Sequence, residues 1–233
     1  MGSNELVTLF FLVAAVLIFL QLRSVLGRRT GNEKQPLDSY SARDAAKGAP
    51  VGDDGRLASR SKLDPVDDEE RFAAIDAYAP PPAELNGSLR DVLMADSGFT
   101  PKDFLNGARM AYEMIVMAFS EGDRKTLKGL LSKEVFDGFA QAISERESRG
   151  ESVKSTFVGI EKADITRASV RDHEIQITVR IISQLIQATY DKDGKLIDGD
   201  PDSVTEVNDI WTFMRDARNR DPNWKLIATE ADQ

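Results

Sequence analysis

The stretch TPKDFLNGARMAYEMIVMAFSEGD (residues 100–123) carries both the start and the end of a helix. Thr100 is a good N-cap, Pro101 suits the first helical position, and Gly122 is typical of a helix end. Between them apolar residues recur at steps of three and four, which puts them on one face. The pattern therefore predicts a helix over residues 101–121. The residues of its buried face are Phe104, Ala108, Tyr112, Ile115 and Phe119.

Two more helices follow, and then the spacing of the apolar residues changes. Asp123 and Ser132 are suitable N-caps for helices over 124–131 and 133–148. Further along, apolar and polar residues alternate in EIQITVRI (174–181), which predicts a half-buried strand. The same strand continues in the other phase through Ile186, Ala188 and Tyr190, and further strands are predicted near residues 204–216 and 223–229.

Helices followed by a run of antiparallel strands indicate an α+β domain. The alternation slips at Ile181–Ile182, where a β-bulge would curl the sheet. We expect the helices to pack on the concave side of this curled sheet, so that the domain is a cone with an apolar pocket. The large apolar residues of these elements are most simply core, and lining a cavity for an acyl chain or a peptide side chain is the alternative interpretation. The candidate pocket-lining residues are Phe104, Tyr112, Ile115, Phe119, Trp211 and Phe213.

At the N-terminus, residues 6–22 (LVTLFFLVAAVLIFLQL) are uncharged and mostly apolar. At about 1.5 Å per residue they reach about 25 Å, near the short end of what crosses a bilayer. A cleaved signal sequence and a buried core helix are the alternatives, but no basic residue precedes the run and no small-residue cleavage pattern follows it. We therefore expect residues 1–29 to be a transmembrane anchor with a basic flank. The basic residues after the run are Arg23, Arg28, Arg29 and Lys34.

These basic residues indicate the orientation of the chain. The positive-inside rule places the C-terminal domain on the cytoplasmic side of a membrane, or on the matrix side in an organelle. The same flank could attract anionic lipid headgroups, so the lipid bilayer is an expected partner.

Between the anchor and the domain the sequence predicts a linker and an arm. Residues 30–66 hold few large apolar side chains, which predicts a disordered linker with a reach of about 35 Å. DDEERFAAIDAYA (67–79) has acidic residues in its first turn and is stopped by Pro80, which predicts a short helix. We expect residues 67–98 to form a helical arm, either packed on the domain or used for recognition. The α+β domain would then span residues 99–233.

Composition excludes several classes of function. The chain has 39 acidic and 30 basic residues, for a formal net charge of −9, and such a charge repels nucleic acid. No cysteine is present, which excludes disulfides, thiolate metal sites and cysteine catalysis. We therefore expect no nucleic-acid partner.

Candidate chemical groups are few and weak. His173 is the single histidine, and we interpret it as a solvated turn residue. DKDGKLIDGDPD (191–202) resembles a calcium loop, but its glycine stands fourth and its twelfth residue is not glutamate. We predict a polar hairpin loop there. The sequence also contains no glycine-rich phosphate loop and no G-x-S-x-G elbow, so we expect neither a cofactor nor a metal.

Four blocks of the chain resemble a known family. They are FLNGARMAYEMIVMAFSEGD (104–123), LKGLLSKEVFDGFAQAISERESRG (127–150), DIWTFMRD (209–216) and DPNWKLIAT (221–229). From about Phe99 to Glu230 the chain is similar to the C-terminal domain of the Tim44-like (TimA) family. This family includes the import-motor adaptor of the mitochondrial inner-membrane presequence translocase and membrane-anchored bacterial relatives.

The resemblance implies a cone-shaped fold of the nuclear-transport-factor-two-like type, an apolar pocket, membrane association and no catalysis. In the mitochondrial adaptor the region before this domain recruits a DnaK-type chaperone, and that region does not match here. The expected function is a membrane-tethered, non-enzymatic adaptor whose protein partners include a DnaK-type chaperone or translocase components. A lipid- or acyl-chain-binding module is the alternative. The anchor favours a bacterial inner membrane, with the mitochondrial inner membrane as the alternative.

Overall fold

The computed structural model describes residues 65–219 and 221–231. The predicted anchor (1–29) and almost all of the predicted linker (30–66) lie outside these ranges. Among the described residues, no helix is both long enough and apolar enough to cross a membrane.

Three helices confirm the predicted helical block. Their bounds are Pro101–Glu121 (α4), Arg124–Leu130 (α5) and Lys133–Ser148 (α6). The side-chain oxygens of Thr100, Asp123 and Ser132 accept hydrogen bonds from backbone N–H groups in the first turns, as the sequence predicted. Gly122 ends α4 in the left-handed conformation (φ 77°), which glycine adopts without strain.

Four antiparallel strands form one sheet in the order β1-β2-β3-β4. Their bounds are Ser152–Arg171 (β1), Glu174–Tyr190 (β2), Leu196–Asp216 (β3) and Lys225–Ala231 (β4). The sequence did not predict β1, because most of its side chains are exposed or half-buried and its apolar alternation is weak.

The predicted hairpin loop over residues 191–202 is wrong in its second half. Only the turn at 191–195 lies outside the strands, and β3 begins at Leu196. Gly199 and Pro201 are typical loop residues, yet here they belong to an irregular part of the strand. The pairing of β2 with β3 steps from Leu185↔Thr205 to Gln187↔Asp200, so residues 201–204 lie opposite a single residue of β2.

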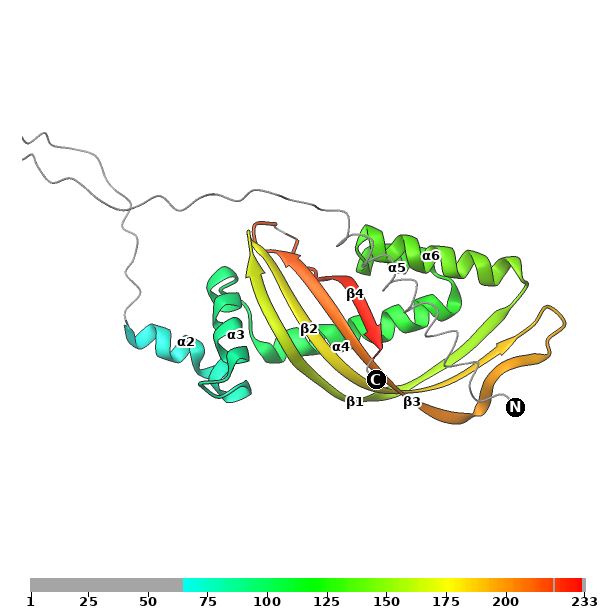
Figure 1. Ribbon diagram of the computed structural model, residues 1–233, viewed down its shortest axis with the longest axis horizontal. Coiled ribbons are helices and arrows are strands. Elements are labelled where there is room, and N and C mark those ends of the chain that lie inside the picture. The colour runs from blue at the N-terminus through cyan, green and yellow to red at the C-terminus, as the bar shows by residue number, and fades with distance from the viewer. Residues whose placement is uncertain (1–64, 220, 232–233) are drawn as a thin grey trace, which may run out of the picture.

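The sheet curls because β1 is longer than the strand it pairs with. β1 has 20 residues and β2 has 17. The extra residues stand at three register shifts, where Val158, Glu161 and Thr166 have no partner of their own in β2. Such bulges bend and twist a strand. In Figure 1 the strands curve around α4, with α6 above it, which confirms the predicted helices on a curled antiparallel sheet.

The bulge predicted at Ile181–Ile182 is wrong. Burial on β2 keeps its alternation through Ser183 and Leu185 and slips only after them. Ser183 is fully buried. Because this core position holds a polar residue, the sequence does not show that the alternation continues past Ile181. The irregularity of β2 lies at Ile186 instead.

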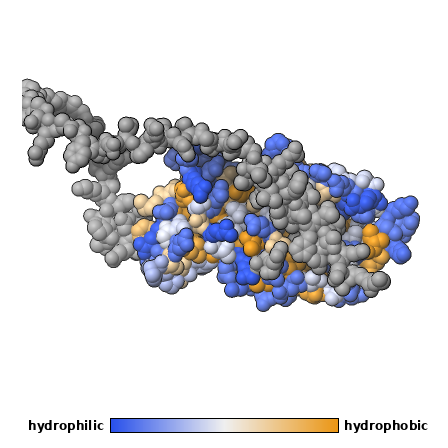
Figure 2. Space-filling model, viewed as in Figure 1, coloured by the Kyte–Doolittle hydropathy of each residue, from blue (hydrophilic) through white to orange (hydrophobic). Residues whose placement is uncertain are grey.

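The core lies between the concave face of the sheet and α4. Tyr112 and Ile115 of α4 belong to the same buried cluster as the aromatic side chains of Trp211 and Phe213 on β3. β2 contributes a row of fully buried side chains, made of Ile175, Ile177, Val179 and Ile181. On the face in view in Figure 2, hydrophobic side chains reach the surface in separate patches among hydrophilic ones.

The arm holds two helices where the sequence indicated one. Their bounds are Pro65–Tyr78 (α2) and Glu84–Ala95 (α3). The backbone N–H of Ile165 in β1 donates a 2.7 Å hydrogen bond to the Tyr78 hydroxyl. Arg215 of β3 makes a 2.7 Å ion pair with Asp96, next to the end of α3. These contacts support an arm that is packed on the domain.

Candidate functional site

A cavity of about 130 Å³ lies between α4, α6 and the strands. Its helical side is mostly apolar, although Ser120, Arg146 and Arg149 also line it. Phe119 of α4 and Phe139 of α6 meet edge to face there, with their ring centroids 4.9 Å apart. Ile115 and Val116 of α4 and Ala142 of α6 extend the same wall.

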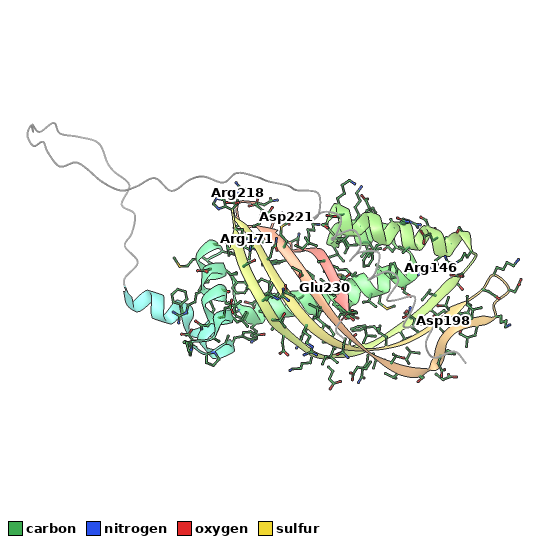
Figure 3. The ribbon with its side chains drawn as sticks, viewed as in Figure 1. Arg146, Arg171, Asp198, Arg218, Asp221 and Glu230 are labelled. Atoms are coloured by element: carbon green, nitrogen blue, oxygen red, sulfur yellow. The ribbon has the colours of Figure 1, made fainter. Side chains whose placement is uncertain are left out.

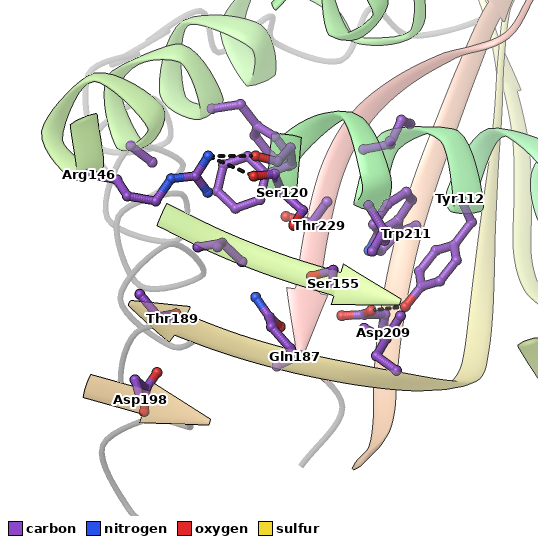
Figure 4. Close-up of a pocket in the computed structure, with 18 of the residues that line it drawn as sticks. Tyr112, Ser120, Arg146, Ser155, Gln187, Thr189, Asp198, Asp209, Trp211 and Thr229 are labelled. Atoms are coloured by element: carbon purple, nitrogen blue, oxygen red, sulfur yellow. Dashed lines mark hydrogen bonds between the residues drawn. The ribbon is translucent and has the colours of Figure 1, made fainter. Parts of the chain in front are cut away.

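The opposite side of the cavity is polar. Ser155 comes from β1, and Gln187 and Thr189 come from β2. In Figure 4 these residues and Asp198 of β3 lie across the cavity from the helices. The cavity therefore has an aromatic and aliphatic wall on one side and a hydrogen-bonding wall on the other, which includes the acidic residues Asp198 and Glu230.

A buried hydrogen-bond chain closes the end of the cavity beside Trp211. The Tyr112 hydroxyl lies 2.7 Å from Oδ2 of Asp209 and 2.8 Å from Oγ of Ser183. An ionised carboxylate only accepts hydrogen bonds, so Tyr112 donates to Asp209 and Ser183 donates to Tyr112. Asp209 is 2% exposed and Ser183 is fully buried.

The buried environment of this hydrogen-bond network shifts the pKa values of Asp209 and Tyr112. Burial raises the pKa of Asp209 to about 6, although hydrogen bonds from Tyr112 and Trp211 oppose that rise. Burial also raises the pKa of the Tyr112 hydroxyl, and the nearby Asp209 charge adds to this effect. At neutral pH the site therefore holds a carboxylate that accepts hydrogen bonds from neutral partners.

Arg146 of α6 lies at another part of the cavity and is engaged by the backbone. Its Nη2 donates to the carbonyl oxygens of Phe119 (3.2 Å) and Ser120 (2.9 Å) at the end of α4, as Figure 4 shows. Burial lowers the pKa of Arg146. This arginine therefore caps the end of α4, where the Phe119 carbonyl also accepts a hydrogen bond from the Gly122 N–H.

Figure 3 separates the labelled charged side chains into two groups. Arg146, Asp198 and Glu230 line the cavity. The second group gathers near the turn between β1 and β2, and it consists of Arg171, Arg218 and Asp221.

The structure brings together four of the six residues predicted to line one pocket. The four that line the cavity are Tyr112, Ile115, Phe119 and Trp211. Phe104 and Phe213 line a second hollow of about 830 Å³ instead, on the side of α4 that faces α5. There the Phe104 ring meets Trp224 edge to face, with a centroid distance of 4.9 Å. That any of these side chains binds a ligand stays a prediction.

Sequence reasoning missed the polar residues of the cavity. Asp209 stands in phase with Trp211 and Phe213 on the buried face of β3, and an acidic residue at such a position was a usable signal. Gln187 and Thr189 gave no comparable signal, because polar residues are common in strands that face solvent.

Of the remaining predicted residues, His173 alone lies in the described ranges, and it does not line the cavity. His173 is exposed in the turn between β1 and β2, with φ 76°. Within residues 65–219 and 221–231, no group of three His, Asp or Glu side chains could hold a metal ion. The flanking basic residues lie outside the described residues, and they are Arg23, Arg28, Arg29 and Lys34.

Comparison with known proteins adds a family. The family model described as "Tim44-like domain" matches residues 85–231, which run from α3 to the end of β4. The mitochondrial import inner membrane translocase subunit TIM44 of Rattus norvegicus is 23% identical over 151 residues, covering 64% of this chain and 33% of that protein. The probable subunit tin-44 of Caenorhabditis elegans is 23% identical over 148 residues, with coverages of 62% and 35%. The chain thus spans about a third of the length of these relatives.

Among solved structures, the similarity is low. The intermembrane space region of the chloroplast protein ARC6 matches with a TM-score of 0.40 and 10% identity, covering 57% of this chain and 96% of that one. A putative dehydratase of the NTF2-like family from Streptomyces avermitilis matches with a TM-score of 0.33 and 16% identity, with the same coverages. Scores this low support no conclusion about this chain.

Proposed function

The chain belongs to the Tim44-like domain family, and from this premise we propose that it is a membrane-tethered, non-enzymatic adaptor for protein partners at an inner membrane. The observation that carries the proposal is the extent of the match, residues 85–231, which includes every described element from α3 onward. The proposed partners are translocase components or a DnaK-type chaperone. The named relatives are import translocase subunits, and this supports a role in protein transport.

The chemistry of the cavity supports binding over catalysis. Asp209 accepts hydrogen bonds from Tyr112 and Trp211, and Arg146 donates to two backbone carbonyls. These two charged groups therefore have structural partners within the fold, while Arg149, Asp198 and Glu230 also line the cavity.

Two locations are compatible with the adaptor proposal. The apolar run at 6–22 and the basic residues after it favour a bacterial inner membrane with a cytoplasmic domain. The relatives are subunits of the mitochondrial inner membrane, which supports the matrix side of that membrane as the alternative.

Lipid or acyl-chain binding is the second candidate function. The wall formed by Ile115, Val116 and Phe119 favours it, because such side chains suit a hydrocarbon. The cavity volume of about 130 Å³ limits the size of the hydrocarbon that could bind there. An engineered apolar cavity of about 150 Å³ holds one benzene, so this cavity has room for the end of an acyl chain only.

Crosslinking in native membranes tests the adaptor. The tagged full-length protein, at near-native expression, would be treated with a mild crosslinker and its attached proteins identified. The matched control keeps residues 1–64 and carries an unrelated domain in place of 65–233. We expect a DnaK-type chaperone or translocase subunits with the full chain and not with the control. Recovery of the bait alone contradicts the adaptor, and recovery of lipid alone favours the second candidate.

A further inference from the structure

The outer edge of β3 lacks a partner strand over more than half of its length. β4 pairs with β3 only over residues 209–214, and β1 and β2 lie on the other side of β3. Over residues 196–208, β3 therefore has β2 along one edge and no described strand along the other. In Figure 1 this part of β3 curves past the end of β4 toward the tip of its hairpin with β2. Such an open edge presents backbone N–H and C=O groups that can pair with another strand.

The open edge is accessible and carries apolar side chains. Residues 200–206 are all exposed to solvent. Leu196, Ile197 and Val204 are 41%, 47% and 51% exposed, so large apolar side chains here face water. A strand that is added to such an edge gains main-chain hydrogen bonds and also covers apolar surface.

The regular part of the open edge lies next to β4. Residues 205–208 pair one for one with β2, and they continue directly from residues 209–214. Beyond them the edge is interrupted, because residues 201–204 lie opposite a single residue of β2 and Pro201 has no N–H to donate. An added strand would therefore begin in line with β4, along residues 205–208.

The charge of the open edge favours a basic partner. The stretch LIDGDPDSVTEVN (196–208) has four acidic residues and no basic one. Among the described residues, no ion pair engages the carboxylates of Asp200, Asp202 or Glu206. Asp200 accepts a hydrogen bond from the backbone N–H of Asp202, and Glu206 accepts one from the Asn208 amide, so both donors are neutral groups.

A second copy of this chain would match the open edge poorly. Antiparallel pairing of two such edges brings carboxylates near carboxylates, and like charges on paired strands are destabilising. An extended segment with lysine or arginine side chains has the opposite charge, which favours its encounter with this edge and suppresses competing partners.

We propose that the outer edge of β3 binds an extended, lysine- or arginine-rich segment of a partner protein as an added strand. The segment pairs with residues 205–208, and its basic side chains contact Asp200, Asp202 and Glu206. The inference deepens the adaptor proposal, on which it rests for the partner being a protein. It concerns a surface that is separate from the apolar wall of the cavity.

Three peptides test the proposal. KVKVKVKV supplies basic side chains and a free backbone, EVEVEVEV reverses the charge, and KVKVKVKV with every backbone nitrogen methylated keeps the charge without any N–H. Fluorescence anisotropy would measure the affinity of each labelled peptide for the full-length protein in phosphatidylcholine nanodiscs, which carry no net charge. Empty nanodiscs serve as the baseline. KVKVKVKV should bind saturably, and the other two peptides should bind at least about tenfold more weakly.

Two variants of equal charge locate the contact. The edge variant neutralises three carboxylates of β3, by Asp200→Asn, Asp202→Asn and Glu206→Gln. The control variant neutralises three exposed carboxylates on helices, by Asp91→Asn, Glu113→Gln and Glu134→Gln. The edge variant should bind KVKVKVKV about tenfold more weakly, as expected for the loss of about three exposed charge pairs. The control variant should bind it as the native protein does.

Hydrogen–deuterium exchange tests the added strand itself. Saturation with KVKVKVKV should slow the exchange of amides over residues 205–208, because an added strand supplies carbonyl acceptors to N–H groups at the open edge. A contact between side chains alone would leave these exchange rates unchanged.

Each contrary outcome is specific. Absence of saturable binding of KVKVKVKV overturns the proposal, and equal binding by the edge and control variants overturns the site. Binding without slower exchange overturns the added strand. Binding that appears only after deletion of residues 30–60 assigns the edge to the chain's own linker, and exchange that slows with protein concentration alone assigns it to a second copy. Either result overturns a partner segment. All of these results leave the crosslinking test of the adaptor unaffected, so the two proposals can fail separately.

Discussion

Asp209 is a buried carboxyl group whose ionisation opposes folding. Its pKa is about 6 in the folded protein against 3.8 for the ordinary group. The folded state therefore binds its proton more tightly, so the contribution to stability is full below pH about 4 and is lost as pH rises to about 6. The loss approaches about 3 kcal/mol, at about 1.4 kcal/mol per pKa unit. Asp209→Asn should remove this pH dependence. The free energy of unfolding of the variant should therefore rise relative to that of the native protein between pH 4 and 6.

Urea unfolding followed by tryptophan fluorescence measures this effect, because both tryptophans, Trp211 and Trp224, lie in the folded domain. Asp91→Asn is the matched control, since Asp91 is exposed on α3. Its profile should parallel that of the native protein. A parallel profile for Asp209→Asn as well would show that the buried carboxyl does not titrate in this range.

At the scale of an element, the hairpin of β2 and β3 depends on one close approach. Gly199 has φ +84°, and a Cβ there would lie 2.2 Å from the carbonyl oxygen of Gln187. Gly199→Ala should force β3 away from β2 beside the polar wall, at a cost of about 1–3 kcal/mol in the free energy of unfolding. Hydrogen–deuterium exchange should show faster exchange of the amides over residues 187–190 and 196–200.

Gly159→Ala provides the comparison for that variant. Gly159 also lies in a strand, but a Cβ there would meet no atom within 4 Å. Gly159→Ala should leave the rates of hydrogen–deuterium exchange in β2 and β3 close to those of the native protein. Equal effects of the two substitutions would mean that strand propensity, and not the close approach at Gly199, controls the hairpin.

At the scale of the whole molecule, membrane attachment is predicted to depend on residues 6–22. Without them the protein should move from the membrane pellet to the supernatant of an alkaline carbonate wash, because about 17 apolar residues are needed to hold it in the bilayer. Deletion of residues 35–51, an equal length of the predicted linker, should leave it in the pellet. If the protein without residues 6–22 stays in the pellet, the attachment lies elsewhere in the chain.

Local signals decide how much of this fold could be predicted. The caps Thr100, Asp123 and Ser132 act within three residues of themselves, so the bounds of α4 to α6 were predictable from the sequence. The bounds of β1 were not predictable, because this strand depends on its pairing with β2 and its own side chains show little apolar alternation.

The candidate site was less predictable than the fold. The apolar wall follows from the periodicity of α4, which includes Ile115 and Phe119. The bond from Tyr112 to Asp209 joins residues 97 positions apart, and the bond to Ser183 joins residues 71 apart. No spacing in the sequence indicates such a pair, because curvature and register of the sheet bring them together.

The same separation of 97 residues becomes a delay when the chain is made. A ribosome adds about 5–20 residues per second, so Asp209 follows Tyr112 by about 5 to 20 s. For most of that interval α4 (Pro101–Glu121) has been fully synthesised, while the strands that will cover its apolar face are incomplete. Other nascent chains on nearby ribosomes can contact this apolar face before the sheet covers it. Slower translation between α4 and β3 would lengthen the exposure and raise the yield of aggregated protein without altering a single contact of the finished fold.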